Sequence, residues 1–196
     1  MKNRNTSKDN TNFDDKVSIR NQILTSIKSP IVLDMFCGEG HIYNSCYKNT
    51  ATEYTGLDNT KVHDDQLCHI CDNEEYVRKN DISRYNVYDS DAYGNGWKLA
   101  FMCAKKTSSP VFAIFITDGL CNDLRVGGQT RFVRSMLDIP RKMKIPAMVR
   151  WHTLFVARCI RKIEEYSGSK LIKGLSSNNG EETKYYGLLF EKQQKQ

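Results

Sequence analysis

The segment Ile31–Gly40 constrains the fold of this chain more than any other stretch of the sequence. It opens with the apolar run Ile31–Leu33, which follows a Ser-Pro pair and is typical of a short buried strand. Asp34 ends this run, and a turn that contains Gly38 and Gly40 comes next. Because glycine tolerates backbone angles that other residues avoid, such a turn lets a ligand approach the main chain closely. The segment therefore indicates a ligand-binding turn at the end of a strand.

The acid at the end of this strand decides which kind of ligand fits. In dinucleotide-binding folds the strand runs into G-x-G-x-x-G, and the pyrophosphate lies on a helix N-terminus. Here Tyr43 occupies the third glycine position, and Asp34 would place a negative charge beside a diphosphate. A carboxylate at that position suits a cationic ligand instead. We therefore expect S-adenosylmethionine, which carries a sulfonium and an amino group, as the cofactor.

Length and composition indicate one globular domain. The chain has 196 residues, which is enough for one domain with a core and too few for two ordinary domains. Hydrophobic residues make up 39% of the chain, and no apolar run reaches the roughly 20 residues that cross a bilayer. The N-terminal stretch 1–15 lacks the apolar core of a signal peptide. We therefore expect a cytoplasmic protein without a membrane segment.

The seven cysteines are an odd number and are scattered along the chain, so we expect them to be reduced and mostly buried. Cys68 and Cys71 form a C-x-x-C pair, with His63 and His69 nearby, and this pattern raises the possibility of a zinc site. A second such pair is absent from the sequence, and alternation along a strand places Cys68 and Cys71 on opposite faces. We therefore interpret both as core cysteines and expect no metal site.

The remaining sequence alternates between helical and strand patterns. Residues 1–13 are polar and without periodicity, which predicts a disordered tail, and residues 14–196 form the single expected domain. Expected helices cover residues 14–28, 41–48, 96–105 and 151–166, and expected strands cover residues 31–33, 53–58, 66–72, 85–91, 111–117, 170–175 and 185–190. This alternation predicts an α/β fold with a mostly parallel sheet and helices on both faces, whereas the last two strands form an antiparallel pair.

The glycine turn and the acids that end the expected strands resemble a known family. Asp34, Gly38 and Gly40 are similar to the D-x-x-x-G-x-G element of class I S-adenosylmethionine-dependent methyltransferases, and the likeness covers about residues 29–192. Asp58 ends the next strand and resembles the acid that binds the ribose hydroxyls in that family. The resemblance implies a Rossmann-like, seven-stranded, mostly parallel sheet with an antiparallel C-terminal hairpin.

Four further residues join the cofactor site that this resemblance implies. Asp72 and Asn73 follow the third expected strand and are similar to the segment that holds the adenine amino group. Asp72 could equally cap a helix and begin its first turn. Phe36, in the glycine turn, and Asp89, near the end of the fourth strand, complete the set of cofactor-binding residues that we expect.

The end of the fourth strand carries the information on the methyl acceptor. The segment Asp89-Ser90-Asp91-Ala92-Tyr93-Gly94 is similar to the D-x-D-P-Y-G segment of tRNA guanine exocyclic-amine methyltransferases. By this resemblance Asp91 orients the target amine and Tyr93 contacts the base, with Asp89 as the competing acid. Ala92 stands where the family has proline, so the resemblance does not assign the acceptor atom. Thr117-Asp118-Gly119 also resembles the end of the fifth strand in that family.

The stretch 119–150 is longer than a usual connection, and we expect it to be irregular. It holds seven cationic and two acidic side chains, which is most of the net charge of +6. Because it follows the fifth strand it lies at the carboxyl edge of the sheet, so we interpret it as a basic insertion that contacts nucleic-acid phosphates. A solvated helix with a charged outer face is the alternative. The expected substrate-binding residues are Arg125, Arg131, Arg134, Arg141, Lys142 and Lys144.

Together these observations lead us to expect a methyltransferase that acts on an exocyclic base amine of nucleic acid, with RNA preferred over DNA. Arg158, Arg161 and Lys162 on the last helix either extend the basic surface or face water. Two alternatives stay open. The acceptor could be a small molecule or a protein, with the basic stretch acting as a lid. The chain could also be a catalytically silent subunit that keeps the cofactor fold and binds only RNA or a partner.

Overall fold

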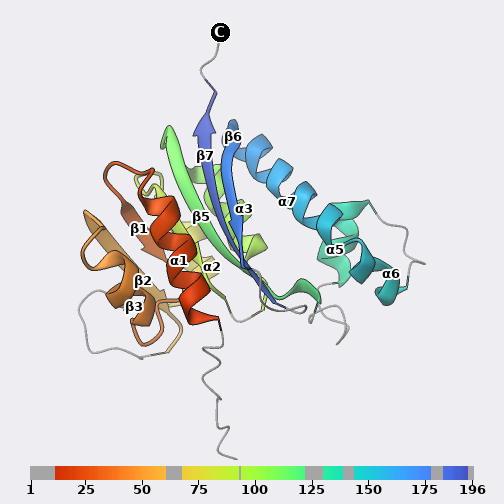
Figure 1. The fold of residues 1–196 in the computed structure, drawn as a ribbon, viewed down its shortest axis with the longest axis horizontal. Coiled ribbons are helices and arrows are strands. Elements are labelled where there is room, and N and C mark those ends of the chain that lie inside the picture. Colours follow the sequence, from red (N-terminus) through yellow and green to blue (C-terminus); the bar gives the residue numbers. More distant parts are fainter. Residues whose placement is uncertain are drawn as a thin grey trace, which may run out of the picture.

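The computed structural model describes residues 12–60, 68–92, 94–121, 130–138, 144–177 and 183–193. At its centre lies a seven-stranded sheet with the strand order β3-β2-β1-β4-β5-β7-β6 (Figure 1). The strands are β1 (Ile31–Asp34), β2 (Glu53–Asp58), β3 (Cys68–Ile70), β4 (Val87–Ser90), β5 (Val111–Asp118), β6 (Ser169–Ser176) and β7 (Lys184–Lys192). Strands β1 to β5 pair in parallel, and β7 runs antiparallel to both β5 and β6. The sheet expected from the sequence is thereby confirmed, including its C-terminal hairpin.

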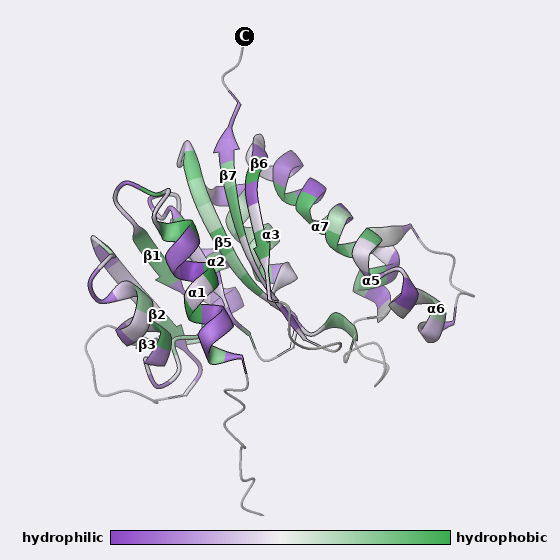
Figure 2. Ribbon diagram, in the orientation of Figure 1, coloured by the Kyte–Doolittle hydropathy of each residue, from purple (hydrophilic) through white to green (hydrophobic). Residues whose placement is uncertain are grey.

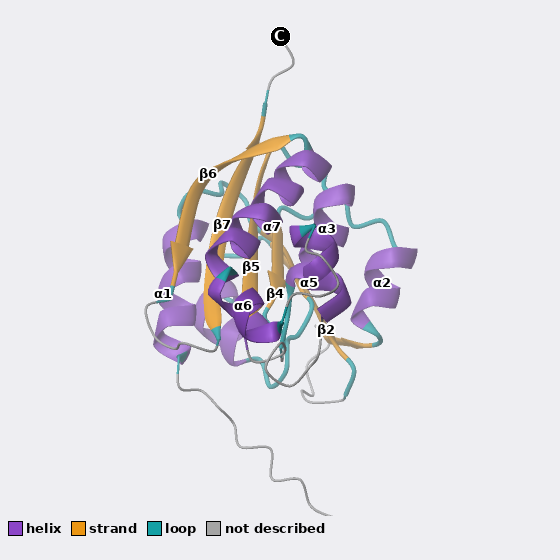
Figure 3. Ribbon diagram, turned by 90° about the vertical axis from the view of Figure 1, so that its right-hand side faces the viewer, coloured by secondary structure: helices purple, strands orange, loops and turns teal. Residues whose placement is uncertain are grey.

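Helices cover both faces of this sheet, as the alternation of elements predicts. They are α1 (Phe13–Leu24), the π-helix η1 (Tyr43–Tyr47), α2 (Asn73–Lys79), α3 (Trp97–Lys106), α5 (Thr130–Leu137), α6 (Ile145–Arg150) and α7 (His152–Ser167). Helix α1 and η1 pack on one face, whereas α3 and α7 pack together on the other. Figure 3 shows the sheet edge-on, between α1 on one side and α2 and α3 on the other.

The two faces of the sheet form two separate hydrophobic clusters. In β5 the side chains of Phe112, Ile114 and Ile116 join the cluster beneath α3 and α7, while Ala113 and Phe115 join the cluster beneath α1. This alternation follows from the period of two in a β-strand. Figure 2 shows the hydrophobic colour concentrated in the central strands, with polar residues on the outer sides of the helices. The core therefore holds the strand ends, and the side chains on them, in fixed positions.

Some elements differ from those expected. Helix α1 begins at Phe13, within the stretch assigned to the tail, and the third strand ends at Ile70 and not at Asp72. Residues 1–11 lie outside the described residues, so the division into a tail and one domain stays a prediction. The helix expected over 41–48 contains the wide turn of η1. Within the described parts of the chain, no helix combines the length and apolar character that a bilayer span requires.

The stretch expected to be irregular contains the helices α5 and α6. Its high charge hid an apolar pattern, since Phe132, Val133 and Met136 recur at helical spacing. Val133 is fully buried, and Phe132 and Met136 pack against the cluster beneath α7. The expectation of an irregular insertion is therefore wrong for residues 130–137, because burial of this apolar face stabilises a helix.

Candidate functional site

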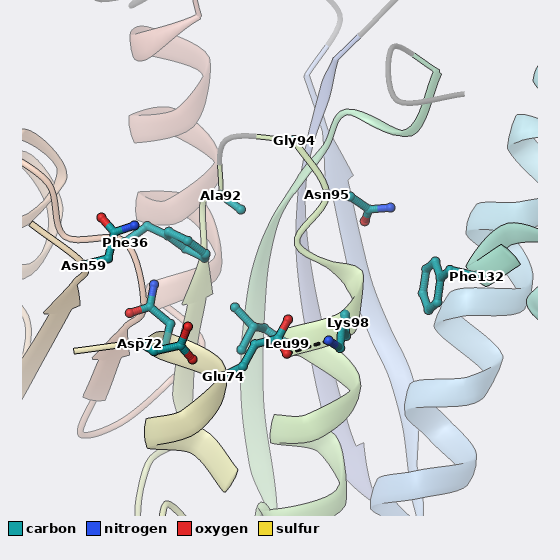
Figure 4. Close-up of a pocket in the computed structure, with 11 residues that line it drawn as sticks. Phe36, Asn59, Asp72, Glu74, Ala92, Gly94, Asn95, Lys98, Leu99 and Phe132 are labelled. Atoms are coloured by element: carbon teal, nitrogen blue, oxygen red, sulfur yellow. Dashed lines mark hydrogen bonds and ion pairs between the residues drawn. The ribbon is translucent and has the colours of Figure 1, made fainter. Parts of the chain in front are cut away.

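A pocket of about 360 Å³ opens at the carboxyl edge of the sheet, where ligands bind in α/β folds of this kind (Figure 4). Residues that follow β1, β2 and β4 line it, together with the first turns of α2 and α3 and one side chain of α5. These residues are Phe36, Asn59, Asp72, Asn73, Glu74, Ala92, Gly94, Asn95, Lys98, Leu99 and Phe132. Segments far apart in the sequence thus meet at one site. Three of the expected cofactor-binding residues are among them: Phe36, Asp72 and Asn73.

Asp34 lies beneath the glycine turn and is almost completely buried. The backbone N–H of Phe36 donates to its Oδ1 at 3.1 Å, and the hydroxyl of Tyr54 donates to its Oδ2 at 2.8 Å. Burial, and next the nearby negative charge of Asp89, raise the pKa of Asp34 to about 8. Asp34 therefore supports the turn through hydrogen bonds and holds a proton near neutral pH.

The turn itself has the backbone geometry that its glycines predict. Gly38 has φ +48° and Gly40 has φ +76°, in the left-handed region that favours glycine. The N–H of Gly38 donates to Oδ2 of Asp58 at 3.1 Å, and the N–H of Thr60 donates to its Oδ1 at 3.0 Å. The structure therefore brings Asp58 directly beside the glycine turn.

Asp72 and Asn73 mark the beginning of α2. Oδ1 of Asp72 accepts a hydrogen bond from the N–H of Glu75 at 2.7 Å, so the helix-capping role considered from the sequence is present. Asp72 lines the pocket as well. The buried amide of Asn73 donates to the carbonyl of Met35, while its Oδ1 has no hydrogen-bond partner among the described residues. A buried acceptor without a partner is unusual, and Asn73 is one of the residues that line the pocket.

Asp89 does not reach the pocket. Its fully buried carboxylate pairs with the guanidinium of Arg20 on α1, with Nε 2.7 Å from Oδ2 and Nη2 2.9 Å from Oδ1. The hydroxyl of Tyr47 on η1 also donates to Oδ2. Both carboxylate oxygens are thus engaged inside the protein. This geometry gives Asp89 a structural role in joining β4 to α1 and does not place it among the cofactor contacts expected from the sequence.

Asp91 lies two residues after Asp89, at the edge of the same ion-pair network. Nζ of Lys16 is 2.9 Å from its Oδ1, Nη2 of Arg20 is 3.1 Å from its Oδ2, and the hydroxyl of Thr117 also donates to Oδ1. Burial opposes ionisation, but the charges of Arg20 and Lys16 prevail and hold the pKa of Asp91 below its usual range. Asp91 is therefore an ionised carboxylate, with 12% of its side chain exposed. The other expected catalytic residue, Tyr93, lies outside the described residues.

Sequence reasoning missed the contribution of α1 to this site. Arg20 lies between the apolar residues Ile19 and Ile23 and is itself buried, with 2% exposure. A buried arginine requires a partner, because an unpaired charge in the core is costly. Lys16, one helical turn earlier, extends the same face toward Asp91. The signal available from the sequence was therefore an arginine within the apolar face of the helix.

A second missed feature is the pair formed by Asp118 and His152. Asp118 ends β5 and is 1% exposed, and His152 begins α7. Nε2 of His152 is 2.7 Å from Oδ2 of Asp118. These residues are 34 positions apart in the sequence and do not form a local motif, so no spacing pattern indicates them.

The expected substrate-binding residues are only partly within the described structure. Arg131 and Lys144 are exposed and Arg134 is half-buried, whereas the other three expected residues, Arg125, Arg141 and Lys142, lie outside the described residues. On α7, Arg158 pairs with Asp138 at 3.6 Å and Lys162 pairs with Glu165 at 3.2 Å. Arg131, Lys144 and Arg150 are thus presented on the surface, while Phe132 of α5 reaches the pocket.

The cysteine prediction needs one correction. Cys68 and Cys71 are only partly buried, because β3 is a three-residue strand at the edge of the sheet. Sγ of Cys68 lies 2.7 Å from Sγ of Cys37, which is buried in the glycine turn. His63 lies outside the described residues. Within the part of the chain that the structure describes, no group of three or more histidine, cysteine or acidic side chains is arranged to hold a metal ion.

Comparison with known proteins gives matches in structure and not in sequence. No protein-family model matches the chain. No curated protein matches it significantly either. Among solved structures, M. jannaschii TYW2 in complex with AdoMet is similar, with a TM-score of 0.53 and 10% identity over 92% of this chain and 76% of that one.

Two further solved structures are similar over most of this chain. Trm1 from Pyrococcus horikoshii with S-adenosyl-L-methionine has a TM-score of 0.60 and 11% identity over 91% of this chain, which spans 53% of the length of Trm1. The plantazolicin methyltransferase BpumL, in complex with a triazolic desmethylPZN analog and SAH, has a TM-score of 0.53 and 12% identity over 95% of this chain and 87% of that one. With the strand order, these likenesses establish the class I methyltransferase fold.

Proposed function

We propose that this chain is a cytoplasmic S-adenosylmethionine-dependent methyltransferase that methylates an exocyclic base amine of RNA. The observation that carries the proposal is the pocket at the carboxyl edge of the sheet, where the expected adenosine-binding segment faces the expected acceptor segment. Phe36, Asn59 and Asp72 lie on one side of it, and Asn95 and Phe132 lie on the other (Figure 4). Several solved proteins with the same fold were determined with this cofactor or its product.

The residues on the first side fit the cofactor. The unsatisfied Oδ1 of Asn73 can accept a hydrogen bond from the adenine amino group, and Phe36 offers an aromatic surface for the adenine ring. Asp58 lies beside the glycine turn, where its carboxylate can accept hydrogen bonds from ribose hydroxyls. Asp34, beneath the same turn, offers a carboxylate that a cationic sulfonium or amino group would favour in its charged form. These assignments agree with the roles that the family resemblance implies.

On the second side, the segment that follows β4 would hold the methyl acceptor. When bound, the cofactor supplies an electrophilic methyl group. Asp91 is kept ionised by Arg20 and Lys16, so it can accept a hydrogen bond from an amine that reaches its exposed edge. Alignment of an amine at attack distance can contribute on the order of 7–11 kcal/mol to catalysis. Orientation by Asp91 and the neighbouring backbone is therefore a sufficient chemical role for this segment.

The charge of the protein supports RNA as the acceptor. Arg131 on α5, Lys144 just before α6 and Arg150 at the end of α6 are exposed, and the chain has a net charge of +6. Cationic side chains of this kind bind phosphates and release counterions. Phe132 links this surface to the pocket, because it lies on α5 and lines the pocket at the same time. A polyanionic substrate could thus contact the basic helices while one base enters the pocket.

Calorimetric titration of S-adenosylmethionine into the protein tests the cofactor half of this proposal. We expect saturable binding to the wild type and at least tenfold weaker binding to Asp58→Asn, which loses the charged acceptor beside the glycine turn. Asp81→Asn is the matched control, because Asp81 is an exposed acid that accepts a hydrogen bond from Ser83 in a turn before β4. The proposal is wrong if the folded wild type binds neither S-adenosylmethionine nor S-adenosylhomocysteine.

A further inference from the structure

Asp118 and His152 form a hydrogen-bonded pair that the cofactor site does not use. Asp118 has a fully buried side chain, and its Oδ1 accepts a hydrogen bond from the N–H of Leu120 at 3.0 Å. Its Oδ2 lies 2.7 Å from Nε2 of His152, whose side chain is 16% exposed. The carboxylate is therefore fixed by the backbone, and it fixes the imidazole ring in turn.

This arrangement determines which ring nitrogen can act on a substrate. Because a carboxylate only accepts hydrogen bonds, Nε2 of His152 carries the proton that is shared with Asp118. In the neutral ring, Nδ1 then has a lone pair and can take up a proton. A carboxylate that orients an imidazole and stabilises the positive charge it acquires is the arrangement found in general-base catalysis.

Asp118 lies beside two residues that line the pocket at its expected acceptor end. Asp118 forms an isolated β-bridge with Asn95, and the N–H of Gly119 donates to the carbonyl of Gly94 at 2.7 Å. Gly94 and Asn95 both line the pocket. In the sheet, β4 separates β1 from β5, so Asp118 lies on the side of β4 away from the expected cofactor site.

A second contact connects helix α7, which begins at His152, to the same end of the pocket. Phe155 lies one turn after His152 on α7, and its ring centroid is 6.2 Å from that of Phe132, which lines the pocket. Asn95 adds an independent observation here, since its buried Nδ2 is a donor without a hydrogen-bond partner among the described residues. A buried donor of this kind costs stability unless a ligand satisfies it. Figure 4 shows Asn95 and Phe132 across the pocket from Phe36 and Asp72.

We propose that His152 is the proton acceptor for the methylated group, that Asp118 is its positioning residue, and that Asn95 donates to a ring nitrogen or carbonyl oxygen beside the acceptor amine. The inference rests on the proposed methyltransferase function. In the step, the amine nitrogen bonds to the methyl carbon as the carbon–sulfur bond breaks, and the sulfur keeps the electron pair. The N–H proton passes to Nδ1 of His152, and Asp118 stays ionised.

Single-turnover methyl transfer from labelled cofactor to total RNA tests this proposal in the full chain. In His152→Gln the side-chain amide can still donate to Asp118, so the buried carboxylate keeps a partner while the base is lost. We expect a rate decrease of about 10²–10⁴-fold, with the cofactor dissociation constant changed less than about twofold. His69→Ala is the control, because His69 is an exposed histidine at the opposite edge of the sheet, and it should keep the wild-type rate.

Chemical rescue separates a proton acceptor from a residue that only supports the fold. Adding imidazole to His152→Ala should restore part of the rate, in proportion to the concentration of neutral imidazole, and should leave His152→Gln unchanged. A His152→Gln variant as fast as the wild type would overturn the proposal while leaving the methyltransferase function intact. A folded His152→Ala variant that is slow and not rescued would also overturn it. A wild type that binds cofactor but methylates nothing would instead remove the proposed function and this inference together.

Discussion

Asp34 holds a proton that an exposed aspartate would release. Its folded pKa of about 8 lies above the value near 4 of an unfolded chain, so between these pH values the folded protein binds more protons than the unfolded one. The stability contributed by the protonated carboxyl is therefore fully present below about pH 4 and is lost as the pH rises through about 8. In Asp34→Asn the neutral amide oxygen can still accept from the N–H of Phe36.

We therefore expect the difference in melting temperature, Asp34→Asn minus wild type, to become more positive as the pH is raised from 5 to 8.5. Thermal unfolding followed by circular dichroism in a series of buffers measures this difference, and groups that titrate in both proteins cancel in it. Parallel curves for the two proteins would show that the folded pKa of Asp34 is not raised.

Arg20 supplies the countercharge for Asp89 in the core. Its replacement by glutamine leaves a fully buried carboxylate without its positively charged partner, and loss of one member of a buried pair costs about 3–5 kcal/mol. We expect Arg20→Gln to lower the free energy of unfolding in urea by that amount. Arg84→Gln is the matched control, because Arg84 pairs with Glu53 at the surface, where such pairs contribute about 0–1 kcal/mol. Equal effects of the two substitutions would contradict the structural role given to Arg20.

At the scale of elements, the strands were the most predictable part of this chain. Runs of β-branched and aromatic residues predict β2 and β5 closely, and β2 has the expected bounds Glu53–Asp58. Helix α5 was not predicted, because the helical spacing of Phe132, Val133 and Met136 lies within a highly charged stretch. The third strand was expected to continue to Asp72, but β3 ends at Ile70. Local pattern therefore predicts β2 even though this strand is only partly buried, and it predicts the almost completely buried β5 as well.

The packing of α1 against the hairpin gives a test at this scale. A Cβ added to Gly187 on β7 would lie 2.5 Å from Cγ2 of Ile19 on α1, so a side chain there forces the helix away from the sheet. We expect Gly187→Val to destabilise the protein by about 1–3 kcal/mol in urea unfolding. Gly174→Val on β6 is the control, because its nearest atoms are flexible side chains at ordinary contact distance, 3.6 Å or more. If both variants were equally stable, α1 would not be seated on β7 as described.

At the scale of the whole molecule, residues of the proposed cofactor site can be grouped from the sequence more readily than residues of the proposed acceptor site. Acids at or just after the ends of parallel strands lie at one edge of the sheet. Asp34, Asp58 and Asp72 could therefore be assigned to that edge from the sequence alone. The pairs Arg20–Asp89 and Asp118–His152 join residues far apart in the chain and follow no spacing rule. They depend on how α1 and α7 pack, which only tertiary structure determines.

The basic surface makes a prediction for the molecule as a whole. If Arg131 and Lys144 contact RNA phosphates, the logarithm of the binding constant should fall linearly with the logarithm of the salt concentration. Replacing either residue by glutamine should weaken binding and reduce that slope by about 1. Lys48→Gln is the control, because Lys48 is an exposed residue at the end of η1, on the other face of the sheet. Fluorescence anisotropy with labelled RNA measures both values, and an affinity independent of salt would contradict the phosphate contacts.

Transfer of the tritiated methyl group of S-adenosylmethionine to total RNA is the most direct test of the proposed RNA methyltransferase activity. The wild type and Asp58→Asn are compared at equal concentration, with DNA and a protein extract as parallel acceptors. With the wild type we expect acid-precipitable label in the RNA fraction, and ribonuclease should release this label. With Asp58→Asn the amount of label should be at least tenfold lower. Label in none of the three fractions, from a folded wild-type protein saturated with cofactor, would contradict the proposed activity.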